Sequence, residues 1–143
     1  MRDARLMLID DRGVIRHWGA ELEAIYGYTA EEAVGRDLNF LVPQPLRSRH
    51  WKGLDKALAS GKLRRDKVAH VPALHKSGKL IAVRAQPSLT FDEQRRANGA
   101  SSTCLGLDPA WLIPVYRVGM RVLSLYDRAA DRRRSRASGE LGV

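Results

Sequence analysis

The residue with the clearest chemical potential lies in a stretch that reads as one helix, PLRSRHWKGLDKALASG, residues 45–61. Leu46, His50, Leu54 and Leu58 recur at every fourth position and therefore share one face of that helix. Because three of the four are leucines, the face is expected to be buried and to carry His50 inward. A buried imidazole either satisfies its nitrogens with hydrogen bonds, as a core residue does, or offers one of them to a metal. The spacing alone leaves both interpretations open.

Basic residues crowd the same region of the sequence. Residues 45–79 contain two aspartates and many more lysines and arginines, at positions 47, 49, 52, 56, 62, 64, 65, 67, 76 and 79. A second cluster, residues 128–136, holds five arginines, and the whole chain carries a net charge of +9. This charge is compatible with nucleic acid, an anionic membrane or an acidic ligand. Nucleic acid is not expected, because no aromatic side chains alternate with the arginines of the second cluster.

The composition limits the class of protein. With 44% hydrophobic and 29% charged residues in 143, the chain is expected to form one soluble domain with a short appended element. No apolar run is long enough to span a membrane, and no signal peptide is expected at the start. The single cysteine, Cys104, excludes an internal disulfide and favours a cytoplasmic setting. No P-loop, GxSxG or HExxH motif is present, so no enzymatic activity is expected.

The order of local patterns predicts an α+β fold. The pattern indicates a hairpin over 4–18, short helices after it, the long helix over 45–60, three strands, and a C-terminal amphipathic helix. Thr29 and Glu32 form a capping-box pattern at the start of one short helix. The three later strands are expected at 67–75, 80–89 and 99–106, with Pro72 marking the first as an edge or broken strand. The expected result is an antiparallel five-stranded sheet with helices on one face.

These motifs resemble PAS sensor domains. The stretches DDRGVIRHWGAELEAIYGYTAEEAVGR and HKSGK carry the resemblance, which covers residues 4–107. In that family the first stretch forms the opening hairpin and the short helices, and the second forms a glycine turn between long strands. The resemblance divides the chain into a PAS sensor domain over 1–107, an amphipathic helix over 108–131, and a basic tail over 132–143 expected to be disordered.

The stretch NFLVPQPLRSRHWKGLDKAL is similar to one branch of that family, the FixL-type haem sensors. The resemblance implies haem b (iron protoporphyrin IX) as cofactor and His50 as the axial ligand of its iron. By the same resemblance, Lys56 and Arg64 match basic positions near the haem propionates. The apolar wall beside His50 would come from Leu46 and Leu54. Such a site needs an apolar slot, a neutral imidazole and positive charge at the rim, and the helix offers all three.

The other side of the expected pocket departs from the family pattern. Oxygen sensors of this branch carry a strand ending in an arginine that hydrogen-bonds bound O2, whereas this chain has DKVAHVPALH. Either Ala69 or His70 falls where that arginine would be. His70 is expected to donate to bound gas, to ligate the iron as a sixth ligand that gas displaces, or to be a surface histidine on the strand. The gas, O2, CO or NO, therefore stays undetermined. Covalent flavin photochemistry is disfavoured because GRDLNFLVP lacks the reactive cysteine, and Cys104 is expected to pack in the last strand.

A wide apolar stripe predicts a protein contact for the C-terminal helix. Ile113, Tyr116, Met120 and Leu123 follow helical spacing over 114–130, and valines broaden the stripe. The expected partner is a second copy of the chain, with output to a further signalling protein. The alternative function is a metal-free PAS interaction or dimerisation module that binds a small apolar or flavin ligand. Haem carriage or storage is a further alternative.

Overall fold

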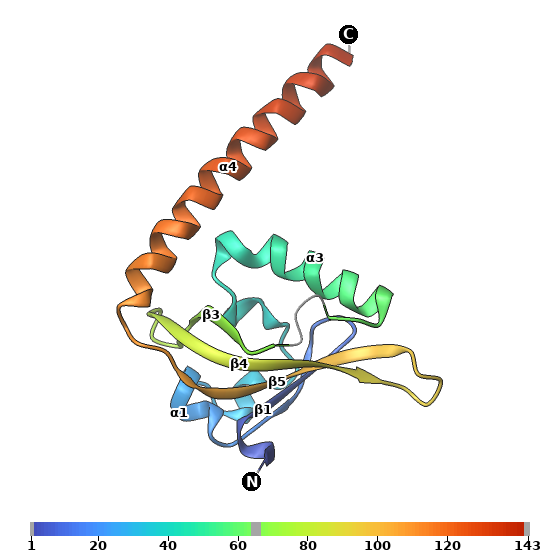
Figure 1. Ribbon diagram of the computed structural model, residues 1–143, viewed down its shortest axis with the longest axis vertical. Coiled ribbons are helices and arrows are strands. Elements are labelled where there is room, and N and C mark those ends of the chain that lie inside the picture. Colours follow the sequence, from blue (N-terminus) through green and yellow to red (C-terminus); the bar gives the residue numbers. More distant parts are fainter. Residues whose placement is uncertain (1, 64–66, 142–143) are drawn as a thin grey trace.

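A five-stranded antiparallel sheet forms the centre of the computed structural model, which describes residues 2–63 and 67–141. The strand order across the sheet is β2-β1-β5-β4-β3 (Figure 1). The strands are β1 (Leu6–Asp10), β2 (Ile15–Trp18), β3 (Ala69–Leu74), β4 (Leu80–Phe91) and β5 (Ala97–Leu107). The predicted sheet is thereby confirmed, with β3 and its Pro72 at one edge.

The opening hairpin forms where the sequence predicted it, but its first residues differ. Arg2–Arg5 make a 3-10 turn, η1, and β1 begins only at Leu6. The turn between β1 and β2 is organised by Asp10, whose carboxylate accepts hydrogen bonds from the backbone N–H groups of Arg12 and Val14. A side chain that satisfies two backbone donors in this way fixes the turn locally.

Short helices connect the hairpin to the long helix. They are α1 (Leu22–Tyr26), α2 (Ala30–Ala33) and the 3-10 turn η2 (Leu38–Leu41). The capping box at α2 is present in full: Glu32 N–H donates to Thr29 Oγ1 at 3.2 Å, and Thr29 N–H donates to Glu32 Oε1 at 3.1 Å. The long helix α3 (Gln44–Ser60) ends at Gly61, which adopts the left-handed conformation with φ 68°.

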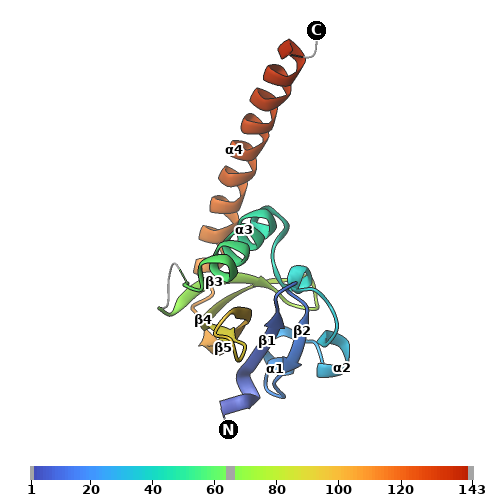
Figure 2. The same cartoon turned by 90° about the vertical axis from the view of Figure 1, so that its right-hand side faces the viewer.

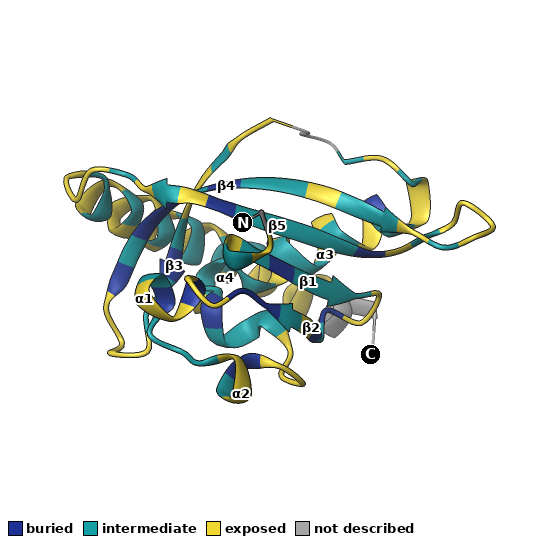
Figure 3. Cartoon of the chain, turned by 90° about the horizontal axis from the view of Figure 1, so that it is seen from below, coloured by how far each residue is buried: buried dark blue, intermediate teal, exposed yellow. Residues whose placement is uncertain are grey.

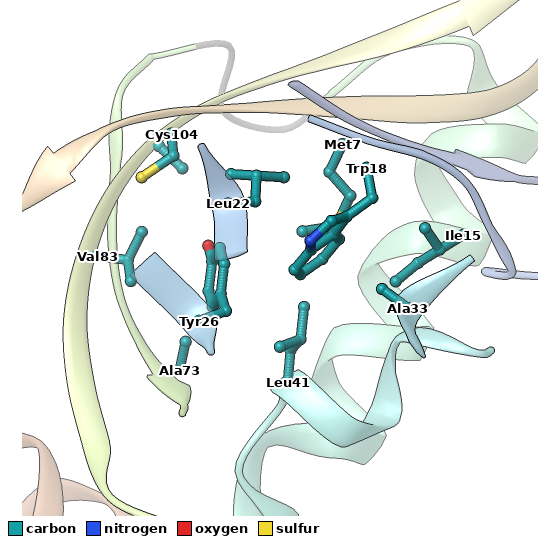
Figure 4. Close-up of a cluster of buried hydrophobic side chains, with 11 residues drawn as sticks. Met7, Ile15, Trp18, Leu22, Tyr26, Ala33, Leu41, Ala73, Val83 and Cys104 are labelled. Atoms are coloured by element: carbon teal, nitrogen blue, oxygen red, sulfur yellow. The ribbon is translucent and has the colours of Figure 1, made fainter. Parts of the chain in front are cut away.

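The core lies between the sheet and the short helices (Figure 4). Trp18 from β2, Leu22 and Tyr26 from α1, and Val83 from β4 are all buried there. Other members are Met7, Ile15, Ala33, Leu41, Ala73, Ala85 and Cys104. Cys104 is 2% exposed, as predicted for a packed rather than a reactive cysteine, and burial raises the pKa of its thiol. Figure 3 shows the buried positions gathered on the strands and on α1.

The C-terminal helix α4 (Leu112–Leu141) is longer than predicted. Residues 132–141 continue the helix, whereas the sequence interpretation assigned them to a disordered tail. Arginine and alanine are good helix formers and this segment contains no proline, so nothing local ends the helix at residue 131. Figure 1 and Figure 2 both show α4 running away from the body of the domain. Among the described helices, none is long and apolar enough to cross a membrane.

Candidate functional site

The helix that carries His50 is fixed to the domain by its neighbour Trp51. The Trp51 ring lies directly over Gly13 in the β1–β2 turn, where a Cβ atom would overlap the ring carbons. Gly13 also has φ 77°, so this position requires glycine for two reasons. At the other edge, Trp51 Nε1 donates a hydrogen bond of 2.6 Å to Asn39 Oδ1. Trp51 thus ties α3 to the opening hairpin and to the segment before the helix.

The predicted stripe on α3 is confirmed as a half-buried surface. Leu46, His50, Leu54 and Leu58 are all partly buried, while the positions between them are mostly exposed. The imidazole of His50 lies edge-on to the Trp51 ring, with centroids 5.3 Å apart and planes at 78°. Since Trp51 is held on both sides, it restricts the position of His50 as well.

His50 has an unusual hydrogen-bond status. Its Nδ1 atom is buried and has no hydrogen-bond partner among the described residues. Burial lowers the pKa of His50, so the ring is neutral at physiological pH. A buried polar nitrogen without a partner costs free energy in a folded protein, and such atoms often mark functional positions. A neutral imidazole is also the form that binds a metal ion.

The expected basic rim is resolved only in part. Lys56 is exposed on α3, and Arg64 lies outside the described residues. Two other arginines of α3 have structural partners. Arg47 Nε donates to the backbone oxygen of Val42 at 3.0 Å, and Arg49 forms a bidentate ion pair with Asp127 on α4 at 2.9 and 3.0 Å.

His70 lies in a different environment from the one expected of a distal haem residue. In the β3–β4 register, Val71 is opposite the core residue Val83, and His70 is opposite Arg84. Because neighbouring residues of a strand point to opposite faces, His70 points away from the face that carries Val83. The inward alternation in β3 is that of the core residue Ala73, which Ala69 shares. His70 is accordingly exposed, with 55% of its side-chain surface accessible.

Asp108 is the partner that the structure gives to His70. His70 Nδ1 lies 2.7 Å from Asp108 Oδ2, and Arg84 Nη1 donates to Asp108 Oδ1 at 3.3 Å. The Asp108 side chain is only 5% exposed, and its backbone N–H donates to the oxygen of Ala82. This cluster joins two strands at the point where β5 leads into α4. It was missed in the sequence because its members lie 24 and 38 positions apart, beyond any local spacing.

Among the described residues, no group of three or more histidine, cysteine, aspartate or glutamate side chains could hold a metal ion. A porphyrin iron needs only one or two protein ligands, since the macrocycle supplies the other four. The residues present fit haem in part. His50 offers a partly buried, neutral imidazole with a buried Nδ1 atom, and Leu46 and Leu54 are half-buried on its face. His70, in contrast, is bonded elsewhere.

No protein-family model matches the sequence. Solved structures are nonetheless similar in fold. A PAS domain from Colwellia psychrerythraea superposes with a TM-score of 0.60 at 21% identity, over 69% of this chain and 81% of that one. The chain has the PAS fold. A light-oxygen-voltage domain solved with a flavin analogue superposes on this PAS fold with a TM-score of 0.59 at 14% identity, over 82% of this chain and 87% of that one.

One curated relative is similar in sequence over a limited stretch of this PAS fold. It is the sensor protein FixL of Bradyrhizobium diazoefficiens, which is 38% identical over 45 residues. The match covers 32% of this chain and 9% of the relative, so it spans less than a tenth of that protein. The predicted PAS architecture is thus confirmed, and the likeness to FixL is partial.

Proposed function

We propose that this PAS domain is a sensor that binds haem b through His50 and detects a diatomic gas, O2, CO or NO. The observation that carries the proposal is the partly buried imidazole of His50, whose buried Nδ1 atom has no hydrogen-bond partner among the residues that the structure describes. A histidine that served only to fill the core would be expected to satisfy this nitrogen. The partial likeness to FixL supports haem as the group that the His50 imidazole would bind.

The residues of this chain have separate tasks in the proposed site. His50 holds the iron as a neutral ligand, because burial keeps its pKa low. Leu46 and Leu54 provide apolar surface on the same helical face, which excludes water from the ligand side of the ring. Lys56 and Arg64 are assigned to the carboxylate edge of the porphyrin. When bound, the haem iron supplies the coordination position at which the gas is held.

The gas-binding side lacks an assigned polar donor. His70 is hydrogen-bonded to Asp108. Because side chains alternate along β3, Ala69 rather than His70 lies on the face of the sheet that carries the core. An apolar residue at this place gives bound O2 no hydrogen bond, whereas CO and NO depend less on one. The proposal therefore favours CO or NO over O2 for this domain.

The structure supports a direct route from His50 to α4. Arg49, adjacent to His50 in α3, holds Asp127 of α4 through two hydrogen bonds. A shift of α3 on gas binding would pull on this pair and change the angle of α4, through which the signal would reach another protein. The domain itself is proposed to have no catalytic role.

Absorption spectroscopy tests the proposal. The purified protein is mixed with hemin, and a Soret band that shifts on reduction and on addition of CO is expected. His50→Ala should lose the CO-dependent shift, while His75→Ala should retain it. His75 is the matched control because its Nδ1 is already bonded to Ser77, at 2.9 Å from the hydroxyl. Failure of the wild type to take up hemin, or an unchanged spectrum in His50→Ala, would overturn haem ligation by His50.

A second candidate function rests on the similarity to the light-oxygen-voltage domain, which was solved with a flavin analogue. In this alternative the domain binds a flavin or another flat apolar molecule without a covalent bond, since the buried Cys104 lies in the core. Yellow protein with flavin absorbance, and no uptake of hemin, would favour this alternative over haem.

A further inference from the structure

A cleft lies between α3 and α4, and none of its lining residues has a role in the proposed haem site. Its volume is about 420 Å³, which is within the range of small-molecule sites, and both helices supply its walls. The helices meet here because Arg49 of α3 forms its bidentate ion pair with Asp127 of α4. Figure 1 and Figure 2 show α3 on the side of the domain from which α4 projects, so the cleft is open to solvent at that side.

Three cationic side chains line the cleft around one paired carboxylate. The hydrogen bonds from Arg49 lower the pKa of Asp127, and the charges of Lys52 and Arg134 lower this pKa further. Both of these side chains therefore lie close enough to Asp127 to act on it. Neither Lys52 nor Arg134 forms a hydrogen bond or an ion pair with another side chain in the described part of the protein. Because Arg49 already satisfies Asp127, two cations are left to bind an anion that enters from solvent.

The middle of the cleft is open because the residue there is small. Asp127, Ala130 and Arg134 stand on successive turns of one face of α4, since they are three and four positions apart. The methyl group of Ala130 leaves space between the paired carboxylate and the guanidinium. Tyr126 also lines the cleft and is 65% exposed. Asp131 lies at the wall as well, and its carboxylate has no partner among the described residues.

We propose that this cleft binds a small phosphate monoester that carries a flat ring, the chemistry of a mononucleotide. The phosphate group accepts hydrogen bonds from Lys52 and Arg134, because ammonium and guanidinium groups are the side chains that bind phosphate best. The ring stacks on Tyr126, which otherwise exposes its aromatic face to water. Asp131 accepts hydrogen bonds from the hydroxyl groups of the sugar. The same carboxylate disfavours a ligand that is anionic throughout.

The ligand also changes the attachment of α4. Among the described side chains, one ion pair, that of Arg49 with Asp127, joins α3 to α4. A phosphate held by Lys52 on one helix and Arg134 on the other adds a second link between them. Hydrogen exchange in α4 should therefore slow when the cleft is occupied.

An NMR titration of the backbone amide signals tests the proposal on protein without cofactor, so its outcome does not depend on haem binding. Adenosine monophosphate should shift the signals of residues 48–52 and 126–134, and it should bind roughly tenfold more tightly than inorganic phosphate because of the ring contact. Its affinity should fall as salt is added. Equal affinity for the two probes would indicate an adventitious ion only and overturn the proposal, as would the absence of shifts in these residues.

One pair of variants tests the shape of the cleft without changing its charge. Ala130→Leu fills the middle of the cleft, keeps every cation and suits a helix, so it should abolish binding of adenosine monophosphate. Ala129→Leu is the matched control, because Ala129 is the neighbouring residue and does not line the cleft. Unchanged binding in Ala130→Leu would overturn the site.

A second set of variants tests the charges and the ring. Lys52→Ala and Arg134→Ala should each weaken binding by about tenfold, since each removes a charge-assisted hydrogen bond to the phosphate. Arg133→Ala is the matched control, because Arg133 adjoins Arg134 but lies outside the cleft. Tyr126→Leu should remove the preference for adenosine monophosphate over inorganic phosphate. Equal losses in Arg133→Ala and Arg134→Ala would show a diffuse charge effect and overturn the phosphate site, and a preference that Tyr126→Leu leaves intact would overturn the ring contact.

Discussion

Replacing His50 with leucine should stabilise the protein in the absence of cofactor. The change removes a buried nitrogen that has no hydrogen-bond partner in the described part of the chain, and it puts an apolar side chain of similar size on an already apolar stripe. Leaving a polar group buried and unsatisfied costs about 1–3 kcal/mol. Because His50 is only partly buried, we expect His50→Leu to raise the free energy of unfolding by about 1–2 kcal/mol. For a chain of this length that corresponds to roughly 3–7 °C in melting temperature.

The assay compares urea and thermal unfolding of the two proteins without cofactor. His75→Leu is the matched control, since its Nδ1 accepts a hydrogen bond from the Ser77 backbone N–H at 3.0 Å and this substitution should not stabilise. Added hemin should make the wild type more stable than His50→Leu. A ligand at a hundred times its Kd stabilises the binding-competent form by about 2.7 kcal/mol, and only the wild type should gain this.

The opposite result would refute the reasoning. If His50→Leu lowers the free energy of unfolding by 1 kcal/mol or more, His50 makes favourable polar contacts in the folded protein and is a structural core residue. If the variant is more stable but hemin stabilises both proteins equally, His50 does not ligate haem, and the missing hydrogen bond at its Nδ1 has another cause. The experiment thereby separates the sensor from the metal-free interaction module.

The remaining predictions concern pH, packing and the link to α4. Burial lowers the pKa of His50, so the unfolded chain binds the proton more readily; the free energy of unfolding should fall as pH drops below about 6.5, and less so in His50→Leu, as urea titrations at several pH values would show. Gly13→Ala should cost about 1–3 kcal/mol, because it adds strain at positive φ and displaces Trp51; a melting temperature equal to that of the wild type would contradict this. Asp127→Asn should weaken the ion pair with Arg49 and speed hydrogen exchange in α4 with little change in global melting, and unaltered exchange would show that the pair does not hold the helix.

The sequence predicted most of the elements because their signals are local. The Thr29–Glu32 capping box, the stop of α3 at Gly61 and the alternation of the strands depend on residues a few positions apart. Such patterns act through backbone hydrogen bonds and side-chain period, so they hold before any tertiary contact forms. The stripe with His50 was found in the same way. Its likeness to FixL-type sensors then suggested a role for the imidazole.

What surrounds these elements was decided only by the tertiary structure. No spacing indicates that Trp51 rests on Gly13, that Arg49 reaches Asp127 or that His70 turns to Asp108. In β3, a shift of one residue decides whether Ala69 or His70 faces inward, and that register depends on pairing with β4. Likewise, the sequence predicted one wide apolar face on α4, and only the tertiary structure shows that part of this face is half-buried and part is exposed. Hydrophobic periodicity determines which side chains tend to be buried, but the approach of distant segments decides which residues bury them. Such long-range contacts leave no local pattern in a single sequence.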